Sequence, residues 1–305
     1  MPAKSTLCHS TVLDCFTPVS SAWYHTYTLW LFVVSDIQSI VLPSTVFAFA
    51  QASAEDGVSM HDIAIRYPKT VAWRLVTLLA FSINNQRRRS AITEDEWNKP
   101  WRPLPSGRLT AVTAKRLGWF ASILALVAGP VLGGGTVQGV LIVALSYLYN
   151  DGGMGDRHWL SRNILNGGGI SSFAAGALSV TQQSSMSRGA TFRLVTIAIV
   201  IGTTIHIQDL YDQAGDEKIG RRTMPLVIGD GAARLTIGMS VMFWSTVVPM
   251  IDGSGPAGVL SVVGLGLIVT GRVSVMRTVG DDIITFSLYN VWLRAIYVLP
   301  LTARD

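Results

Sequence analysis

Three aspartates in this chain stand at a spacing that would align them on one face of a helix. They are Asp209, Asp212 and Asp216, at positions i, i+3 and i+7 of the run DLYDQAGD. Carboxylates so placed are neighbours on a helix and repel one another. A divalent cation removes that repulsion, and Mg²⁺ binds through carboxylates together with substrate phosphate oxygens. The spacing therefore favours a Mg²⁺ site over the alternative, a solvated helix end with acidic surface residues.

Basic residues follow the aspartates directly, at Lys218, Arg221 and Arg222. Arginine contacts phosphate with two parallel hydrogen bonds, whereas lysine acts as a point charge. Acidic and basic groups together indicate a metal-bridged diphosphate. The competing interpretation is that these cations reflect only the enrichment of Lys and Arg in cytoplasmic loops.

A second polar segment, residues 84–108, repeats this combination. Its candidate metal ligands are Asn85, Glu94 and Asp95. Its candidate diphosphate donors are Lys99, Arg102 and Arg108. Three prolines between these donors restrict the backbone that carries them. We therefore expect the two segments to form one site.

The elements that position these residues are apolar. Hydrophobic residues make up 49% of the 305 residues, charged residues only 14%, and the mean hydropathy is +0.40. Soluble domains carry about 25% charged residues, so a soluble protein is excluded. An apolar stretch of about 20 residues can cross a bilayer as a helix. The candidate spans are Thr28–Ala50, Thr70–Asn84, Ala111–Leu132, Thr136–Asn150, Asn163–Val180, Thr191–Gln208, Leu235–Ile251, Gly255–Gly271 and Ile283–Leu301.

These spans predict an all-α polytopic membrane protein of about nine transmembrane helices. Acidic clusters follow the second and the sixth span, which suggests one domain over residues 1–305 with two four-helix halves and a ninth helix. Glycines inside the spans, including Gly167, Gly176, Gly264 and Gly266, are expected to allow close helix packing.

Lysine and arginine are concentrated in the loops after even-numbered spans. The positive-inside rule places those loops, which carry the acidic clusters, and the N-terminus in the cytoplasm. The net charge of +5 then reflects topology and a phosphate site. No sequence motif for nucleic acid binding accompanies it.

Two runs, NKPWRPLPSGR from residue 98 and DLYDQAGDEKIGRRT from residue 209, resemble the UbiA superfamily of membrane prenyltransferases. In that family NDxxDxxxD precedes NKPxRPxPSG, and DxxDxxGD precedes a K-x-G-[KR]-[RK]-T tail. The resemblance implies a helical bundle around a central cavity, where two Mg²⁺ ions bind an isoprenoid diphosphate whose tail lies among the helices. It also assigns the metal and diphosphate roles above to the matching residues.

The first motif departs from the family pattern. Asn85 fits its opening Asn, but Gln86 replaces the next Asp, and the acidic pair Glu94-Asp95 comes later than usual. The loop after the fourth span lacks the family's Tyr-x-x-x-Lys phosphate contact, for which Arg157 or Arg162 is a substitute.

The altered first motif resembles a fungal branch that includes a membrane-bound sesquiterpene cyclase. This resemblance implies an endoplasmic reticulum enzyme that ionises farnesyl diphosphate and cyclises the cation in a dry, aromatic cavity. Each aromatic candidate for that cavity could equally be a packing or interfacial residue. The candidates are Phe81, Tyr147, Tyr149, Phe173, Tyr211, Phe286 and Tyr289.

Two other functions stay open. A prenyltransferase would pass the isoprenoid to an aromatic or other small acceptor, and a transporter or non-catalytic membrane protein would leave both acidic motifs unexplained. Asp36 and Asn166 lie within apolar spans, where a polar side chain is either functional or bonded to a neighbouring helix. His206 is expected to be a hydrogen-bonding neighbour of the site.

Overall fold

The computed structural model describes residues 18–55 and 58–302, and every regular element in those ranges is helical. Five helical stretches are long and apolar enough to cross a membrane. They are Ala22–Ala54, Ala111–Leu132, Arg188–Lys218, Asp230–Ile251 and Pro256–Val275. The predicted class, an all-α integral membrane protein, is therefore confirmed, while the number of nine spans stays a prediction. Residues 1–17 and 303–305, which the predicted single domain includes, lie outside the described part.

The elements fall into long rods and short connecting helices. The rods are α1 (Pro18–Val33), α2 (Leu42–Ala54), α3 (Met60–Gln86), α5 (Ala111–Leu132), α6 (Thr136–Tyr149), α8 (Trp159–Gln182), α9 (Arg188–Thr204), α12 (Asp230–Ile251), α13 (Pro256–Val275) and α14 (Val279–Tyr297). The short α-helices are α4 (Arg89–Asn98), α7 (Met154–Arg157), α10 (Asp209–Lys218) and α11 (Met224–Ile228). The 3₁₀ turns are η1 (Val34–Asp36), η3 (Ile205–Gln208) and η4 (Leu299–Thr302), and η2 (Ile37–Val41) is a π-helical turn.

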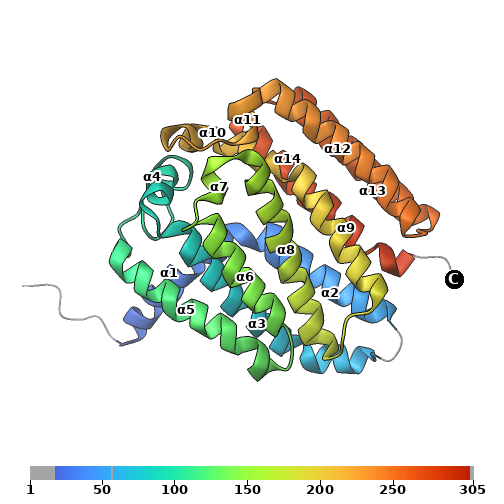
Figure 1. Cartoon of the computed structure of the whole chain (residues 1–305), viewed down its shortest axis with the longest axis horizontal. Coiled ribbons are helices and arrows are strands. Elements are labelled where there is room, and N and C mark those ends of the chain that lie inside the picture. The colour runs from blue at the N-terminus through green and yellow to red at the C-terminus, as the bar shows by residue number, and fades with distance from the viewer. Residues whose placement is uncertain (1–17, 56–57, 303–305) are drawn as a thin grey trace, which may run out of the picture.

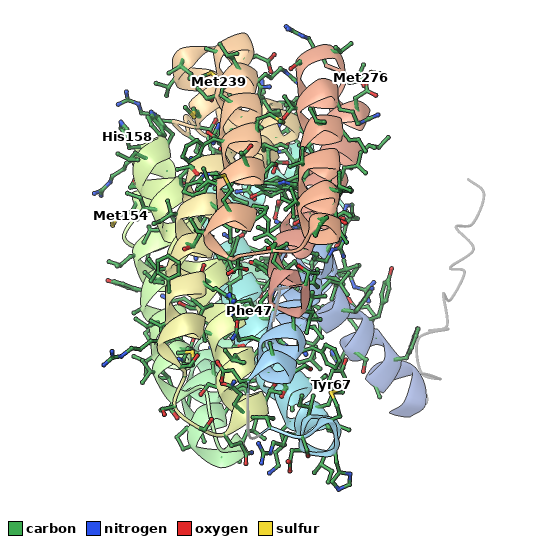
Figure 2. The ribbon with its side chains drawn as sticks, turned by 90° about the vertical axis from the view of Figure 1, so that its right-hand side faces the viewer. Phe47, Tyr67, Met154, His158, Met239 and Met276 are labelled. Atoms are coloured by element: carbon green, nitrogen blue, oxygen red, sulfur yellow. The ribbon has the colours of Figure 1, made fainter. Side chains whose placement is uncertain are left out.

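The short helices α4, α7, α10 and α11 gather at one end of the rods (Figure 1), and Figure 2 shows the rods standing side by side. Those short helices contain or adjoin both polar motifs. Residues 89–98, in the first part of the polar segment, form α4. The prolines follow α4 and shape the turns after it.

The rod α3, which corresponds to the second predicted span, is longer than its apolar pattern indicates. α3 begins at Met60, ten residues before the predicted span. Ser59 caps it, because its Oγ accepts a hydrogen bond from the backbone N of Asp62 at 3.1 Å. Hydropathy alone missed these first turns because they carry charged side chains and a proline.

Glycines set the closest approaches between rods. A Cβ on Gly176 of α8 would lie 1.9 Å from the ring of Trp73 on α3, and a Cβ on Gly167 would lie 2.5 Å from the Ala198 carbonyl oxygen on α9. The prediction of close packing is confirmed at these positions. It is wrong for Gly264 of α13, where a Cβ would meet nothing within 4 Å.

We expect Gly176→Ala to destabilise the fold by about 1–3 kcal/mol, because the fully buried Trp73 ring must move. Gly264→Ala is the matched control, and replacing a helical glycine there should be neutral or stabilising by up to about 1 kcal/mol. Thermal unfolding in detergent measures both. Equal unfolding temperatures for the two variants would contradict the packing described.

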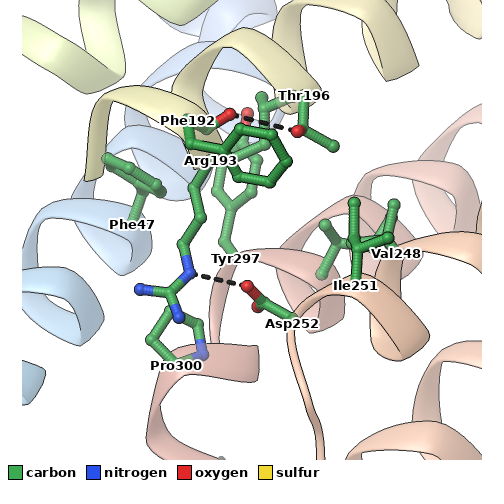
Figure 3. A pocket seen from close by; sticks show the side chains of 11 residues that line it. Phe47, Phe192, Arg193, Thr196, Val248, Ile251, Asp252, Tyr297 and Pro300 are labelled. Atoms are coloured by element: carbon green, nitrogen blue, oxygen red, sulfur yellow. Dashed lines mark hydrogen bonds and ion pairs between the residues drawn. The ribbon is translucent and has the colours of Figure 1, made fainter. Parts of the chain in front are cut away.

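Near the N-terminal end of α9, the lining of an apolar pocket includes an ion pair (Figure 3). Arg193 Nε donates to Asp252 Oδ1 at 2.7 Å and thereby ties α9 to the turn after α12. Arg193 lies 12 residues before Ile205, where η3 begins, which is about 18 Å along the helix axis. Both acidic motifs lie at the opposite end of the rods, so we place the chemistry there.

Candidate active site

The two acidic motifs meet where α4 packs on α10. Asn98 Nδ2 donates to the Asp212 carbonyl at 3.1 Å, and Asn98 Oδ1 accepts from the Gly215 amide at 3.2 Å. A Cβ at position 215 would lie 2.4 Å from the Asn98 amide, so glycine is needed for this contact. The predicted union of the two motifs in one place is therefore seen in the structure.

A polar cavity lies beneath this junction and encloses about 690 Å³, counted out to its open mouth. Four basic and three acidic residues line it. The bases are Lys99, Arg102, Arg162 and Arg221, and the acids are Asp36, Glu94 and Asp212. Asn85, Tyr211 and Phe286 also line it. The cavity thus holds predicted residues from both motifs.

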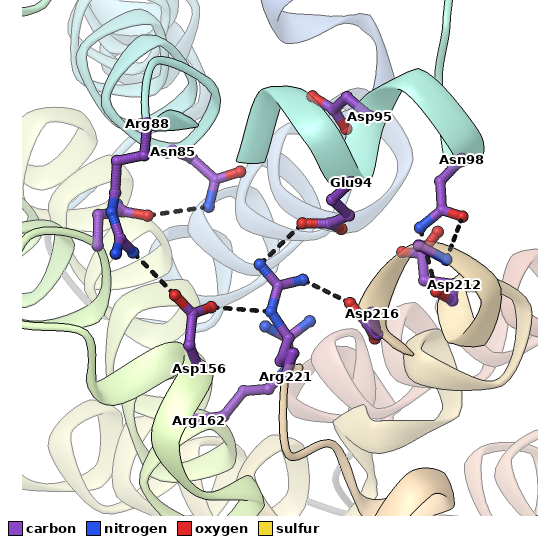
Figure 4. Close-up of polar contacts among 12 residues, drawn as sticks. Asn85, Arg88, Glu94, Asp95, Asn98, Asp156, Arg162, Asp212, Asp216 and Arg221 are labelled. Carbon is purple, nitrogen blue, oxygen red and sulfur yellow. Dashed lines mark hydrogen bonds and ion pairs between the residues drawn. The ribbon is translucent and has the colours of Figure 1, made fainter. Parts of the chain in front are cut away.

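Arg221 links three carboxylates from three short helices (Figure 4). Its Nη2 lies 2.8 Å from Glu94 Oε2 on α4, and its Nη1 donates to Asp216 Oδ1 on α10 at 2.6 Å. Its Nε donates to Asp156 Oδ1 on α7 at 2.8 Å. Glu94 is buried, which disfavours its ionised form, but Arg221 and Lys99 outweigh burial and hold its pKa below the usual range. Arg221 therefore links the three short helices α4, α7 and α10 through ion pairs.

The other two aspartates of α10 have separate basic partners. Arg162 donates from Nε and Nη2 to Asp209 Oδ1 at 3.1 and 2.9 Å, and Asp209 is fully buried. Lys99 Nζ donates to both carboxylate oxygens of Asp212, at 2.9 and 3.0 Å. Arg162, weighed from sequence as a substitute phosphate contact, thus belongs to the site.

Two buried carboxylates of the site have an oxygen that could bind a divalent cation. No group of three or more His, Cys, Asp or Glu side chains stands ready-made for a metal among the residues that the structure describes. However, Asp209 Oδ2 and Asp216 Oδ2 are buried and lack hydrogen-bond partners. Unpartnered buried carboxylate oxygens are costly unless something binds them, and they are ligands suited to Mg²⁺. The donor set therefore fits Mg²⁺ shared with a phosphate ligand.

Glu94 and Asp95 differ although they are adjacent. Glu94 faces the cavity, whereas Asp95 lies outside its lining and is 1% exposed. Both Asp95 oxygens accept from Arg102 Nη1, at 2.9 and 3.1 Å. Asp95 thus orients Arg102, and its predicted role as a metal ligand is not supported by its position.

Burial of Asp95 raises its pKa to about 6, although Arg102 opposes the shift. An acid whose folded pKa is raised contributes stability below its unfolded pKa, and that contribution is lost as pH rises through 6. We expect wild type to lose stability relative to Asp95→Asn between pH 4 and pH 7, by at most about 3 kcal/mol. Thermal unfolding in Mg²⁺-free detergent measures the difference. Parallel pH profiles for the two proteins would contradict the raised pKa.

An apolar pocket adjoins the polar cavity and encloses about 340 Å³, counted out to its open mouth. Phe81, Tyr149 and Asn166 line both spaces. Phe173, a predicted cavity aromatic, contacts Phe81 edge-on with ring centroids 5.9 Å apart and lines the apolar side. A charged head and a hydrocarbon tail of one ligand could therefore occupy the two spaces together.

Several predicted site residues lie away from the cavity. Arg108 donates to Thr28 Oγ1 at 3.1 Å and lies over the Tyr24 ring of α1. Lys218 lies over the Trp97 ring, and Arg222 is exposed. Tyr147 is 62% exposed on the outer side of α6. These positions give no support to the cavity roles predicted for them.

Tyr289 is fully buried behind the cavity, where its hydroxyl shares a 2.9 Å hydrogen bond with Thr204. It stacks on Phe286, which does line the cavity. His206 has neighbours Thr236 and Asn163 and does not line the cavity, in keeping with the hydrogen-bonding role expected of it.

Asp156 was missed by sequence reasoning. It accepts from Arg88 at 2.9 Å as well as from Arg221, and no motif marks it. Asn150, also unpredicted, accepts from Asn85 Nδ2 at 3.3 Å. The only available signal was the departure of this loop from the family pattern.

Comparison with known proteins identifies the fold. Residues 70–293 match the UbiA prenyltransferase family. The chain is 30% identical over 293 residues to somaliensene A/B synthase of Streptomyces somaliensis, covering 93% of each chain. It is 28% identical over 281 residues to the fumagillin beta-trans-bergamotene synthase of Aspergillus fumigatus, covering 91% of this chain and 92% of the relative.

A solved UbiA homolog from Archaeoglobus fulgidus, bound to DMAPP and Mg²⁺, has a similar fold. Its TM-score is 0.59 at 14% identity, over 88% of this chain and 98% of that one. A structure described as digeranylgeranylglyceryl phosphate synthase gives a TM-score of 0.63 at 16% identity, over 92% and 99%. The family match, the relatives and the fold agree with the resemblance seen in the two motifs. The chain therefore belongs to the UbiA prenyltransferase family.

Proposed function

We propose that the protein is a Mg²⁺-dependent membrane terpene cyclase that converts farnesyl diphosphate to a sesquiterpene hydrocarbon and diphosphate. The observation that carries the proposal is the junction of the charged cavity with the apolar pocket at Phe81, Tyr149 and Asn166. Similarity to two relatives named as terpene synthases, over more than nine-tenths of the chain, supports cyclisation.

The basic residues have a clear part in ionisation. Lys99, Arg102, Arg162 and Arg221 line the cavity, where they would bind the diphosphate and stabilise the charge that grows on its oxygen as the C–O bond breaks. Asp209 and Asp216, with Glu94 and Asp212, would hold two Mg²⁺ ions. When bound, Mg²⁺ supplies a Lewis acid for the leaving diphosphate.

The apolar pocket then determines the fate of the allyl cation. Aromatic faces such as those of Phe81 and Phe173 attract a cation, and the absence of water protects it. A distal double bond of the same substrate supplies the electron pair for the new C–C bond. Loss of a proton from a neighbouring carbon gives the hydrocarbon, so no second substrate is needed.

We also propose that the end with α4 and α10 faces the cytoplasm, in an endoplasmic reticulum membrane. The concentration of Arg and Lys in the loops at this end supports the orientation. The pairing of α4 with α10 supports the proposed two halves, since each helix follows a rod of its own half.

The test uses membranes that contain the protein, Mg²⁺ and farnesyl diphosphate without an acceptor. We expect a sesquiterpene hydrocarbon by gas chromatography and mass spectrometry, absent with chelator and in Asp212→Asn. Geranyl and geranylgeranyl diphosphate in parallel define the chain length. Product formed only with an added phenol would replace cyclisation by prenyl transfer. The absence of diphosphate release with every substrate would contradict both activities.

A further inference from the structure

Asp36 is a carboxylate in the middle of an apolar span. The stretch Ala22–Ala54 is long and apolar enough to cross a membrane. An ionisable group in such a stretch costs free energy, so its presence points to a function. The helix is interrupted at this residue, by the 3₁₀ turn η1 and then by the π-helical turn η2. Such interruptions are frequent at functional sites. Here they direct Ser35, Asp36 and Ser39 to the polar cavity.

Hydrogen bonds from a buried arginine stabilise the interruption. Arg74 of α3 donates from Nη1 to the Val41 carbonyl at 3.3 Å and also to the Thr45 hydroxyl. Thr45 Oγ1 in turn donates to the same carbonyl at 2.6 Å. These bonds tie the end of the π-helical turn to α3. The fold therefore stabilises the irregular backbone that exposes Asp36 to the cavity.

Asp36 differs from the other cavity carboxylates in its partner. Glu94 lies 2.8 Å from Arg221, and Asp212 lies 2.9 Å from Lys99. Asp36 accepts a 2.8 Å hydrogen bond from the Ser82 hydroxyl, and within the described residues it forms no ion pair. Arg102, which lines the same cavity, is bonded instead to Asp95 and to the hydroxyl of Ser35, the residue before Asp36. A carboxylate held by a neutral hydroxyl keeps more affinity for a proton than one paired with a cation.

Asp36 also lies beside the boundary between the two spaces. Ser82 follows Phe81, which lines both the polar cavity and the apolar pocket. Ile40, one helical turn after Asp36, lines the apolar pocket. A carbocation in that pocket would therefore have Asp36 close to its edge.

We propose that Asp36 accepts the proton that ends the cyclisation, an inference that rests on the proposed function. The C–H bond next to the final cation breaks, and its electron pair forms the C=C bond of the product. The proton passes to a carboxylate oxygen of Asp36 and leaves to solvent through the polar cavity. The substrate class is a terpenyl cation generated in place, and no further reactant is required.

The test measures diphosphate release and hydrocarbon yield separately in Asp36→Asn, with farnesyl diphosphate and Mg²⁺. The amide preserves the shape and the bond from Ser82 but removes the base. Because general bases contribute about 100-fold or more, we expect hydrocarbon to fall by about 100-fold. Diphosphate release should persist, with a terpene alcohol formed by water capture as the main product.

Ser82→Ala is the matched variant, because it removes the hydroxyl partner and keeps the carboxylate. We expect it to retain hydrocarbon as the main product. Unchanged hydrocarbon in Asp36→Asn would overturn the proposal and leave the diphosphate as the base. A parallel fall of diphosphate release and hydrocarbon, or the same alcohol from Ser82→Ala, would show a structural role and overturn it too. Failure of cyclisation itself is distinguished by wild type, which would then yield no hydrocarbon.

Discussion

Arg221→Met should lower diphosphate release by about 100-fold and also destabilise the protein. The substitution keeps most of the side-chain volume but leaves Glu94, Asp216 and Asp156 without their shared cation. Removing one partner of a buried ion pair costs about 3–5 kcal/mol. Losing a positive charge that stabilises the leaving group lowers turnover by a further 100-fold or so. Thermal unfolding in detergent and a diphosphate release assay measure the two effects.

The adjacent arginine provides a control. Arg222 belongs to the same sequence motif, but its side chain is exposed and does not line the cavity. Arg222→Met should therefore keep the unfolding temperature and most of the turnover. If both variants lost activity equally, the motif rather than the cavity would define the site, and our placement of Arg222 would be wrong.

Asp209→Asn should lower turnover by more than about 100-fold, because a Lewis-acid site of several kcal/mol loses a charged ligand. Its Oδ2 is buried without a partner and stands ready for a cation. The variant should also be less stable than the wild type, because Arg162 would remain buried without a counter-charge.

A double variant separates stability from chemistry. Asp209→Asn with Arg162→Met removes both charges, so we expect the unfolding temperature to recover while turnover stays low. The measurements are thermal unfolding and diphosphate release in the presence of Mg²⁺. Recovery of turnover in the double variant would mean that Asp209 serves only to neutralise Arg162.

The sequence by itself determined the class of fold and the location of the chemistry. Apolar runs identify membrane helices because a helix needs about 20 apolar residues to cross the hydrocarbon core. For one of them, Ala111–Leu132, the predicted bounds are those of α5. The DLYDQAGD spacing predicted a helix at α10, because residues three and four apart share a face. The motifs also identified the UbiA family.

The tertiary structure decided which charged residues act together. Lys99 and Lys218 are the lysines of the two motifs, and Arg221 and Arg222 are adjacent in one of them, but of these four only Lys99 and Arg221 line the cavity. Pairing depends on how α4, α7 and α10 pack, and no local pattern encodes a contact between Arg221 and Asp156, 65 positions apart. Likewise Asp36 was ambiguous in sequence, because its role depends on a helix interruption supported by Arg74 from another rod. Charges near in sequence were separated, and distant ones were joined, because burial allows a charge to persist only beside its partner.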